Sequence, residues 1–385
     1  MNLSRDKWEK IYLGNIVSEL RITSKNPIED GYDKYIGFEH IESENIYIKD
    51  YGKLSDGVTF KKTFKTNDVL FGKIRAYLKK VAVAPFDGIC SGDILVLRTK
   101  NENKLNQKII PYLLTTQTFL KRAIDSSIGT TLPRTKWEHL NKHEVLLPSI
   151  KEQNIIISLF NAFEKSTTQI EKQERNLKLL RYKLINKLSK QKPILGNLIN
   201  LLKCKICKID DVAKEINDRI ENPFKLGYEK FIGLESFESG ELIISNYLST
   251  EKLVSTMKLC KKGDVLFARR NAYLKRTSIT DSDAVCSGDV IVIRVENKII
   301  LPEYLILVMN TDEFWEYAIS NAAGTMSKRV KWRDLAKYTF DLPDLETQKK
   351  ILEIFNEIEK NIKLIIEQKP SLNNLKQKLL NEIFG

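Results

Sequence analysis

The sequence lacks the features of membrane-spanning proteins and of disulfide-bonded secreted proteins. No apolar run approaches the ~20 residues that a membrane-spanning helix needs. The N-terminal stretch MNLSRDKWEK has no apolar core of the kind that signal peptides carry. Five cysteines, an odd number in a chain of 385 residues, indicate reduced thiols rather than a disulfide framework. We therefore expect a cytoplasmic protein.

Motifs of common nucleotide-dependent enzymes are also missing. There is no G-x-x-x-x-G-K-[ST] phosphate loop and no glycine-rich fingerprint after a strand-like run. The Asn-Pro-Pro-aromatic signature of adenine methyltransferases is absent, because Asn222-Pro223-Phe224 lacks the second proline. Scattered acidic residues and lysines could form a nuclease site in space, but no spacing argues for one. We therefore expect a chain that is not an enzyme.

The charge balance points to a polyanionic partner. Lysine and arginine number 63 against 50 acidic residues, which gives a net charge of +13. Such a surplus suits nucleic acid or an anionic membrane surface. The hydrophobic fraction of 42% and the charged fraction of 29% are those of an ordinary soluble protein.

An internal repeat organises the whole chain. DVLFGKIRAYLKK (68–80) and DVLFARRNAYLKR (264–276) are identical at 8 of 13 positions, at an offset of 196 residues. Further segments match in the same order, at an offset of 196 or 195. These pairs are 31–43 with 227–239, 90–98 with 286–294, 129–137 with 324–332, and 146–156 with 341–351. The chain therefore consists of one unit written twice.

Each copy ends in a stretch that is typical of a long helix with a partner helix. Residues 151–192 contain no Gly or Pro, and 42 residues would form a rod of roughly 60 Å. Residues 347–384 repeat the pattern, with a break or kink expected near Pro370. Apolar residues recur at seven-residue spacing, which predicts a coiled-coil seam. The predicted packing residues are Phe163, Ile170, Leu177, Leu184, Ile358, Ile365, Leu372 and Leu379. The first stretch is itself basic, and its charge could contact phosphates or simply be solvated.

Ahead of each helix, the sequence predicts a mixed α/β globule of about 150 residues. VLF, ILVLR and VIVIR are short β-branched runs bounded by Gly and Asp, which is typical of strands. Residues 109–124 and 300–319 show helical spacing of apolar residues beside a Pro. These runs do not determine how the strands pair.

Two kinds of motif carry a resemblance to a known family. Each copy has a G-T…W stretch, at 129–137 and 324–332. It is followed by LPSIKEQ (147–153) or LPDLETQ (342–348), which leads into the long helix. In this duplicated order the chain resembles the specificity subunit of type I restriction–modification enzymes. The second copy departs mildly from the family pattern, with Thr347 in place of Glu.

The resemblance implies a function and a set of partners. Each globule would be a target recognition domain that reads one half of a split site in double-stranded DNA. The helices would pair antiparallel, set the distance between the half-sites and dock two methyltransferase subunits, with restriction subunits as a further possible partner. The chain would need no cofactor, since S-adenosylmethionine and ATP would bind the partner subunits. No membrane partner is implied.

We thus predict an α/β (α+β) fold, with two similar mixed globular domains separated by two long antiparallel coiled-coil helices in a pseudo-two-fold repeat. The predicted boundaries are 1–150 for the first recognition domain, 151–192 for the central helix, 193–346 for the second recognition domain and 347–385 for the C-terminal helix.

Basic residues cluster with tyrosines in two stretches of each copy, where they could bind phosphates and base edges. The predicted DNA contacts are Lys73, Arg75, Tyr77, Lys79, Lys80, Arg134 and Lys136 in the first copy. Those in the second copy are Arg269, Arg270, Asn271, Tyr273, Lys275, Arg276, Lys328, Arg329 and Lys331. Positions that differ between the copies, such as Arg75 and Asn271, are the better candidates for reading bases. A solvated surface is the alternative.

Two short pairs could imitate a zinc site. Cys204 and Cys207 form a single CxxC, and His139 and His143 are four residues apart. The pairs lie in different copies, and neither has a counterpart in the other copy. We therefore expect no metal.

Two other functions remain open from the sequence. The chain could be a coiled-coil assembly protein without sequence-specific DNA binding, or it could carry nuclease or methyltransferase activity of its own. Salt-sensitive binding to duplex DNA would exclude the first alternative. The absence of both activities from the purified chain would exclude the second.

Overall fold

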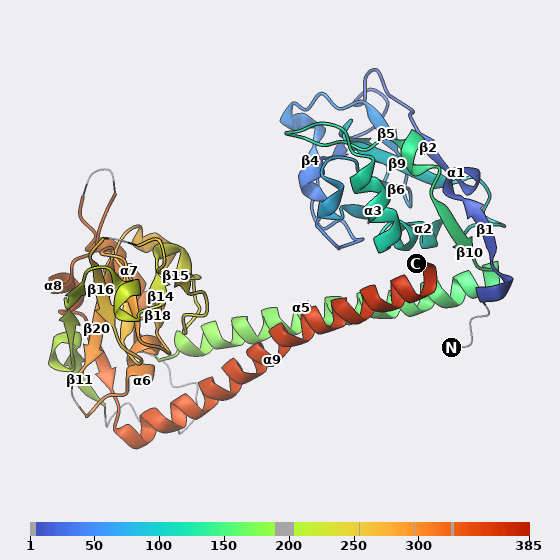
Figure 1. The fold of residues 1–385 in the computed structure, drawn as a ribbon. Coiled ribbons are helices and arrows are strands. Elements are labelled where there is room, and N and C mark those ends of the chain that lie inside the picture. The colour runs from blue at the N-terminus through green and yellow to red at the C-terminus, as the bar shows by residue number, and fades with distance from the viewer. Residues whose placement is uncertain (1–4, 189–203, 254, 297, 325–326) are drawn as a thin grey trace. The chain divides into compact units, whose positions relative to one another are not determined.

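The computed structural model describes residues 5–188, 204–253, 255–296, 298–324 and 327–385 (Figure 1). The chain forms two compact units. Unit 1 comprises Met1–Ile170 and Glu367–Gly385, and unit 2 comprises Glu171–Ile366. The division falls inside the two long helices, so each unit contains one globule, or head, with a stretch of both helices.

Two sheets and a ribbon build the head of unit 1. The ribbon pairs β1 (Glu9–Tyr12) with β10 (Glu144–Leu147). An antiparallel sheet has the order β2 (Val17–Leu20), β9 (Ile94–Thr99), β6 (Val69–Gly72), β7 (Val81–Val83). A second sheet has the order β4 (Gly52–Lys53), β3 (Lys34–Ile36), β8 (Gly88–Cys90), β5 (Lys62–Phe64), and β3 runs parallel to β8. The α-helices of this head are α1 (Leu13–Ile16), α2 (Ile110–Leu113), α3 (Gln117–Asp125) and α4 (Trp137–Leu140).

The head of unit 2 repeats this plan. Its ribbon pairs β11 (Lys205–Lys208) with β21 (Thr339–Leu342). Its first sheet has the order β12 (Ala213–Ile216), β20 (Val290–Val295), β17 (Val265–Ala268), β18 (Thr277–Ile279). Its second sheet has the order β13 (Arg219–Ile220), β16 (Met257–Cys260), β19 (Ala284–Cys286), β14 (Lys230–Ile232), β15 (Leu248–Ser249). Its α-helices are α6 (Pro302–Val308), α7 (Asp312–Ser320) and α8 (Trp332–Leu335).

The strand β6 shows why the head has two cores. Its side chains alternate between two buried clusters, because successive residues of a strand point to opposite faces. Phe71 joins the cluster on the helix side, where it lies edge-on to Phe119 of α3 at 5.7 Å between ring centroids. Leu70 joins the cluster between the two sheets. A strand buried on both faces needs an uninterrupted apolar run, which is what VLF supplies.

Each long helix is fixed to its own head by a buried glutamine. The helices are α5 (Ile150–Ile185) and α9 (Leu345–Phe384). Gln153 of α5 accepts a hydrogen bond from the Asn106 backbone N–H (2.9 Å) and donates to the carbonyls of Lys104 and Pro148 (2.8 and 2.9 Å). Gln348 of α9 makes the equivalent set of three bonds in unit 2, and neither glutamine is solvent-exposed. The motif glutamine therefore determines where each helix leaves its head.

Two expectations about these helices are corrected. α5 ends at Ile185 and not at residue 192; residues 186–188 form a turn, and residues 189–192 lie outside the described residues. Of the break or kink expected near Pro370, the break is wrong, because α9 continues through it. Ser371 does not cap a new helix there: its hydroxyl donates to the carbonyl of Glu367 at 3.2 Å. Within the described residues, no helix is long and apolar enough to cross a membrane.

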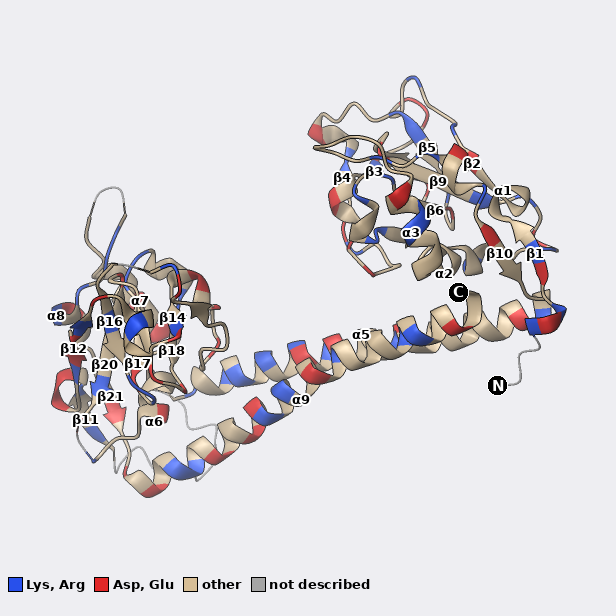
Figure 2. Ribbon diagram, in the orientation of Figure 1, with Lys and Arg blue, Asp and Glu red and all other residues tan. Residues whose placement is uncertain are grey.

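Inside each unit the two helices pack against one another through a buried ion pair. In unit 1, Lys376 of α9 pairs with Glu164 of α5. In unit 2, Arg181 of α5 pairs with Glu359 of α9 at 2.8 Å. The repeat offset of 195 relates Glu164 to Glu359 and Arg181 to Lys376, so the same contact is made twice with the helices exchanged. Charges of both signs also line the helices along their length (Figure 2).

Most of the predicted heptad positions lie beside the most deeply buried residues of the helix pair and do not coincide with them. Of the eight, Ile358 is buried. The other seven, Phe163, Ile170, Leu177, Leu184, Ile365, Leu372 and Leu379, are half-buried.

Candidate nucleic-acid interface

In each head, two loops that are distant in sequence lie side by side. In unit 1 the loop after β6 meets the loop before α4 through backbone hydrogen bonds. The N–H of Arg75 donates to the carbonyl of Pro133 (2.9 Å), and that of Thr135 donates to the carbonyl of Lys73 (3.0 Å). In unit 2 the equivalent bonds join Asn271 to Lys328 and Val330 to Arg269. The two basic stretches of each copy therefore form one surface.

The loop after β6 has an unusual backbone that both copies keep. A short 3₁₀ helix (Ala76–Leu78) lies between Arg75 and Lys79, whose φ angles are +47° and +50°. In unit 2 the equivalent residues Asn271 and Lys275 have φ angles of +54° and +49°. Left-handed backbone at a residue other than glycine costs roughly 1–2 kcal/mol. Such strain is typical of functional turns, and this turn displays a tyrosine in each copy: Tyr77 is 54% exposed and Tyr273 66%.

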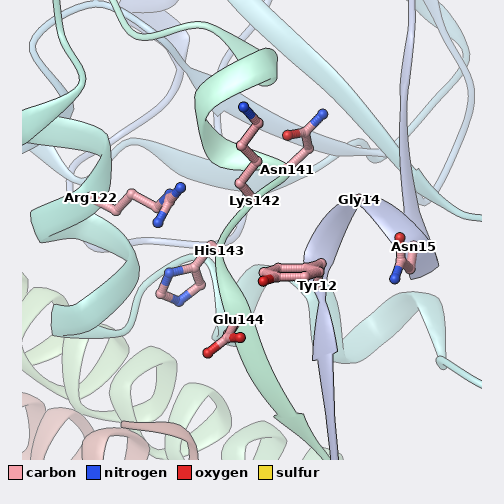
Figure 3. Close-up of a pocket in the computed structure, with 8 residues that line it drawn as sticks. All are labelled: Tyr12, Gly14, Asn15, Arg122, Asn141, Lys142, His143 and Glu144. Carbon is pink, nitrogen blue, oxygen red and sulfur yellow. The ribbon is translucent and has the colours of Figure 1, made fainter.

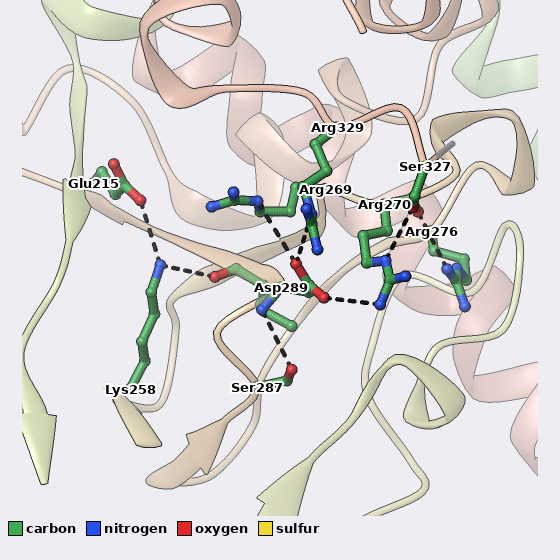
Figure 4. A network of polar contacts seen from close by, with 10 residues as sticks. Glu215, Lys258, Arg269, Arg270, Arg276, Ser287, Asp289, Ser327 and Arg329 are labelled. Atoms are coloured by element: carbon green, nitrogen blue, oxygen red, sulfur yellow. Dashed lines mark hydrogen bonds and ion pairs between the residues drawn. The ribbon is translucent and has the colours of Figure 1, made fainter. Parts of the chain in front are cut away.

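One aspartate in each head lies between basic side chains of the two loops. In unit 1, Asp93 accepts from Arg134 Nε at 3.0 Å and lies 3.7 Å from Lys73 Nζ. Hydrogen bonding to this carboxylate raises the pKa of the Arg134 guanidinium. In unit 2, Asp289 accepts from Arg329 Nε (3.1 Å) and Arg270 Nη1 (3.2 Å), as Figure 4 shows. Both aspartates come directly after a Ser-Gly step in the repeat. Neither aspartate is among the predicted DNA contacts.

Some of the predicted contacts hold the head together instead of facing solvent. Lys80 donates to the carbonyl of Phe38 (2.8 Å) and lies over its ring at 4.3 Å. Lys79 pairs with Glu44. In unit 2, Lys275 pairs with Asp312 at 2.7 Å, and Arg276 donates to the carbonyl of Leu234 at 3.0 Å. These side chains shape the turn.

Other predicted contacts are free to bind a ligand. The side chains of Arg75, Lys136, Lys328 and Lys331 are exposed and make no ion pair with a described residue. Each head therefore presents at least two exposed cations that make no ion pair with a described residue. Near them lie an exposed tyrosine and an arginine that is hydrogen-bonded to an aspartate. Such a surface suits a polyanion, with Lys and Arg on phosphates and planar groups near the bases.

The comparison with protein families decides the classification. A family model described as the type I restriction modification DNA specificity domain matches residues 5–180 and again residues 203–374. The chain belongs to this family.

Two curated specificity subunits are similar to parts of the chain. The type I restriction enzyme EcoDI specificity subunit of Escherichia coli is 31% identical over 162 residues, which cover 42% of this chain and 36% of that protein. The HindI specificity subunit of Haemophilus influenzae is 24% identical over 189 residues, which cover 46% and 39% of the two chains. The matches thus span little more than a third of each relative's length.

Solved structures share the fold over nearly the whole chain. A chain from a study of complex assembly and conformational transition of the type I restriction–modification system has a TM-score of 0.62 at 17% identity, and the match covers 98% of this chain and 97% of that one. The S subunit of a type I system from M. genitalium has a TM-score of 0.52 at 14% identity, with 98% and 96% covered. At such identities the likeness shows the fold alone.

The head of unit 1 has a further hollow, of about 990 Å³, whose lining shares no residue with the basic loops (Figure 3). Arg122, Lys142 and His143 line it together with Tyr12 of the ribbon. Burial, and then the charge of Arg122, lower the pKa of His143 to about 4, so the imidazole is neutral at pH 7. None of the residues that line this hollow is a predicted site residue.

No group of three metal-ligating side chains comes together in the part of the chain that the structure describes. Neither Cys204 nor Cys207 forms a disulfide. Burial raises the pKa of Cys207 to about 11, which disfavours the thiolate that a metal would need.

Proposed function

We propose that this chain is the DNA-specificity subunit of a type I restriction–modification system, and that each head reads one half of a bipartite duplex site. In this proposal the recognition domains are residues 1–150 and 193–346, and those predicted contacts that are exposed on the two loops face the DNA. The chain itself performs no chemistry. S-adenosylmethionine and ATP bind its partners.

One observation carries the proposal. The same pair of loops, held by equivalent backbone bonds and an equivalent aspartate, recurs in both heads, while residues on the loops differ. Arg75 in one copy is Asn271 in the other, although both occupy the same left-handed position. A constant frame with variable contacts is what two readers of different half-sites require.

The paired helices have their own part in the proposal. α5 and α9 set the spacing of the half-sites and dock two methyltransferase subunits, through which restriction subunits join. The repeated buried ion pair supports this, since it holds α5 and α9 in a defined register within each unit.

Reconstitution tests the proposal directly. The full chain is assembled with its methyltransferase partner, and methylated adenines are mapped on genomic DNA. We expect a bipartite motif with a fixed gap. A contiguous motif, or DNA binding that does not depend on sequence, would contradict the proposal. The chain alone serves as the control, and methyl transfer or cleavage by it would favour an enzyme instead.

A further inference from the structure

We propose that the rim of a hollow beside the basic loops of the first head, formed by Arg21 and Glu138, and the equivalent positions of the second head, Asn217, Arg219 and Arg333, read base edges in the DNA groove. The inference rests on the proposed function and names residues that the sequence analysis did not single out.

The hollow is part of the interface already described. Its volume is about 430 Å³, and its walls include Arg134 and Lys136 from the loop before α4 and Trp137 at the start of α4. Any duplex that contacts Arg134 and Lys136 therefore lies across its mouth.

The lining of the hollow includes a lysine and a glutamate, called here the floor, whose contacts recur in the second head. In unit 1, Lys62 donates to the carbonyl of Ile94 (2.8 Å) and lies 3.8 Å from the nearly buried Glu19. In unit 2, Lys258 donates to the carbonyl of Val290 (3.0 Å) and lies 3.4 Å from Glu215 (Figure 4). The repeat offset of 196 relates these residues one to one. Both heads therefore keep the same lysine, the same glutamate and the same hydrogen bond to a backbone carbonyl.

The rim differs where the floor does not. Arg21 follows β2 and Asn217 follows β12 in the same register, because Leu20 pairs with Val96 and Ile216 with Val292. At the other side of the rim, Glu138 and Arg333 are each the second residue of the short helix that begins with the shared tryptophan. Thr23 is likewise replaced by the exposed Arg219.

The chemistry of the rim fits bases rather than phosphates. Arg21 donates to Glu138 at 3.0 Å and to Glu19 at 2.7 Å. Glu138 is exposed on a basic surface, where a carboxylate would repel the DNA backbone. A carboxylate accepts from the amino group of cytosine, whereas arginine pairs with guanine and asparagine with adenine. The two rims therefore carry different base-reading groups on one frame.

A graft of the rim tests the inference. In the full chain, assembled with the methyltransferase subunit, Arg21→Asn is combined with Glu138→Arg to install the residues of the second head. We expect the half-site of the first head to change, or to lose discrimination at one or two base pairs by about tenfold or more, while the other half-site and the gap persist. The matched control is Lys10→Asn with Glu144→Arg, an exposed ion pair of the same head on the ribbon. It should leave the motif unaltered.

The reciprocal graft, Asn217→Arg with Arg333→Glu, should alter only the other half-site. If a graft abolishes methylation, the assembled complex is offered a pool of randomised duplexes, and selection of a new half-site supports the inference. An unchanged motif in both grafts, or a pool that yields no half-site, overturns it and leaves Arg21–Glu138 as a surface ion pair. If instead the unmodified complex methylates no bipartite site, the proposed function fails.

Discussion

His143 is held neutral inside the head of unit 1, and this gives the head a dependence on pH. The ring lies edge-on to Phe119 at 5.3 Å, with Arg122 and Glu144 as the charged groups that affect it. Its pKa is about 4 in the folded head against an ordinary value of 6.5. Between these values the unfolded chain binds a proton that the folded head does not, so stability falls as the pH is lowered from 6.5 to 4. Because the ring is partly exposed, we expect a loss of about 1 kcal/mol.

The variant His143→Tyr tests this, since the second head has Tyr338 at the equivalent position. Thermal unfolding is followed between pH 7 and pH 4.5, and the variant should lose less stability over that range than the original chain. His139→Tyr, at an exposed position, is the control and should behave as the original. Equal pH dependence in all three proteins would refute the role assigned to His143.

At the level of single residues, the sequence identified the basic stretches but not their geometry. Lys73 and Arg134 are 61 positions apart, so only the fold reveals that one aspartate contacts both. Lys80 and Arg276 were predicted to contact DNA, yet both donate hydrogen bonds to backbone carbonyls. Composition shows that a charge is present and cannot show which neighbour has already neutralised or bound it.

Among the helical elements, the buried pair of Glu164 and Lys376 stabilises the packing of α5 on α9 in unit 1. The side chains of both residues are 7% exposed. Removing one partner leaves an uncompensated buried charge, which costs about 3–5 kcal/mol. We therefore expect Lys376→Met to lower the free energy of unfolding of this unit by about 3 kcal/mol.

Denaturant unfolding of the single and double variants measures this contribution. The double variant Glu164→Leu with Lys376→Met should recover most of the lost stability, because no charge remains buried without a partner. Lys378→Met, an exposed position on the same helix, is the matched control and should change little. A double variant as unstable as the single one would show that packing, and not the ion pair, dominates.

The same ion pairs explain why the helix seam was only approximately predicted. A pattern of apolar residues placed the seam at Phe163 and Ile170, which are half-buried. The deepest row passes instead through Phe160, Glu164 and Arg181. A charged residue is ordinarily interpreted as exposed, so a seam that buries charges is displaced when it is inferred from hydrophobicity. A break at Pro370 was expected from the local preference of proline alone, yet α9 is continuous there.

For the whole molecule, the repeat predicted the architecture, and the short strands concealed the topology. Two α/β heads and two long helices follow from the offset and from the heptad spacing. The parallel pairing of β3 with β8 does not, because each strand has three residues and the partners are more than fifty positions apart. The choice among possible partners depends on how the buried faces fit together, and a short run of residues carries too little of that information.

The charge of the whole molecule gives the last prediction. Two exposed cations in each head, Arg75 and Lys136 in one and Lys328 and Lys331 in the other, make no ion pair with a described residue, so we expect their charges to displace counterions from bound DNA. Each phosphate contact contributes about −0.9 to the slope of log affinity against log salt, so the assembled complex should show a slope of about −4 or steeper.

Anisotropy measurements on a labelled duplex between 50 and 200 mM salt, roughly the range over which such contacts lose their affinity, determine this slope. Arg75→Gln with Lys136→Gln should make it less steep by about 2, since two contacts are lost from one head. Lys10→Gln, an exposed lysine on the ribbon of the same head, should leave it unaltered. If the slope is equal in all three proteins, the DNA phosphates do not contact Arg75 or Lys136. This conclusion holds for any DNA sequence, because the slope depends on the number of phosphate contacts and not on the bases.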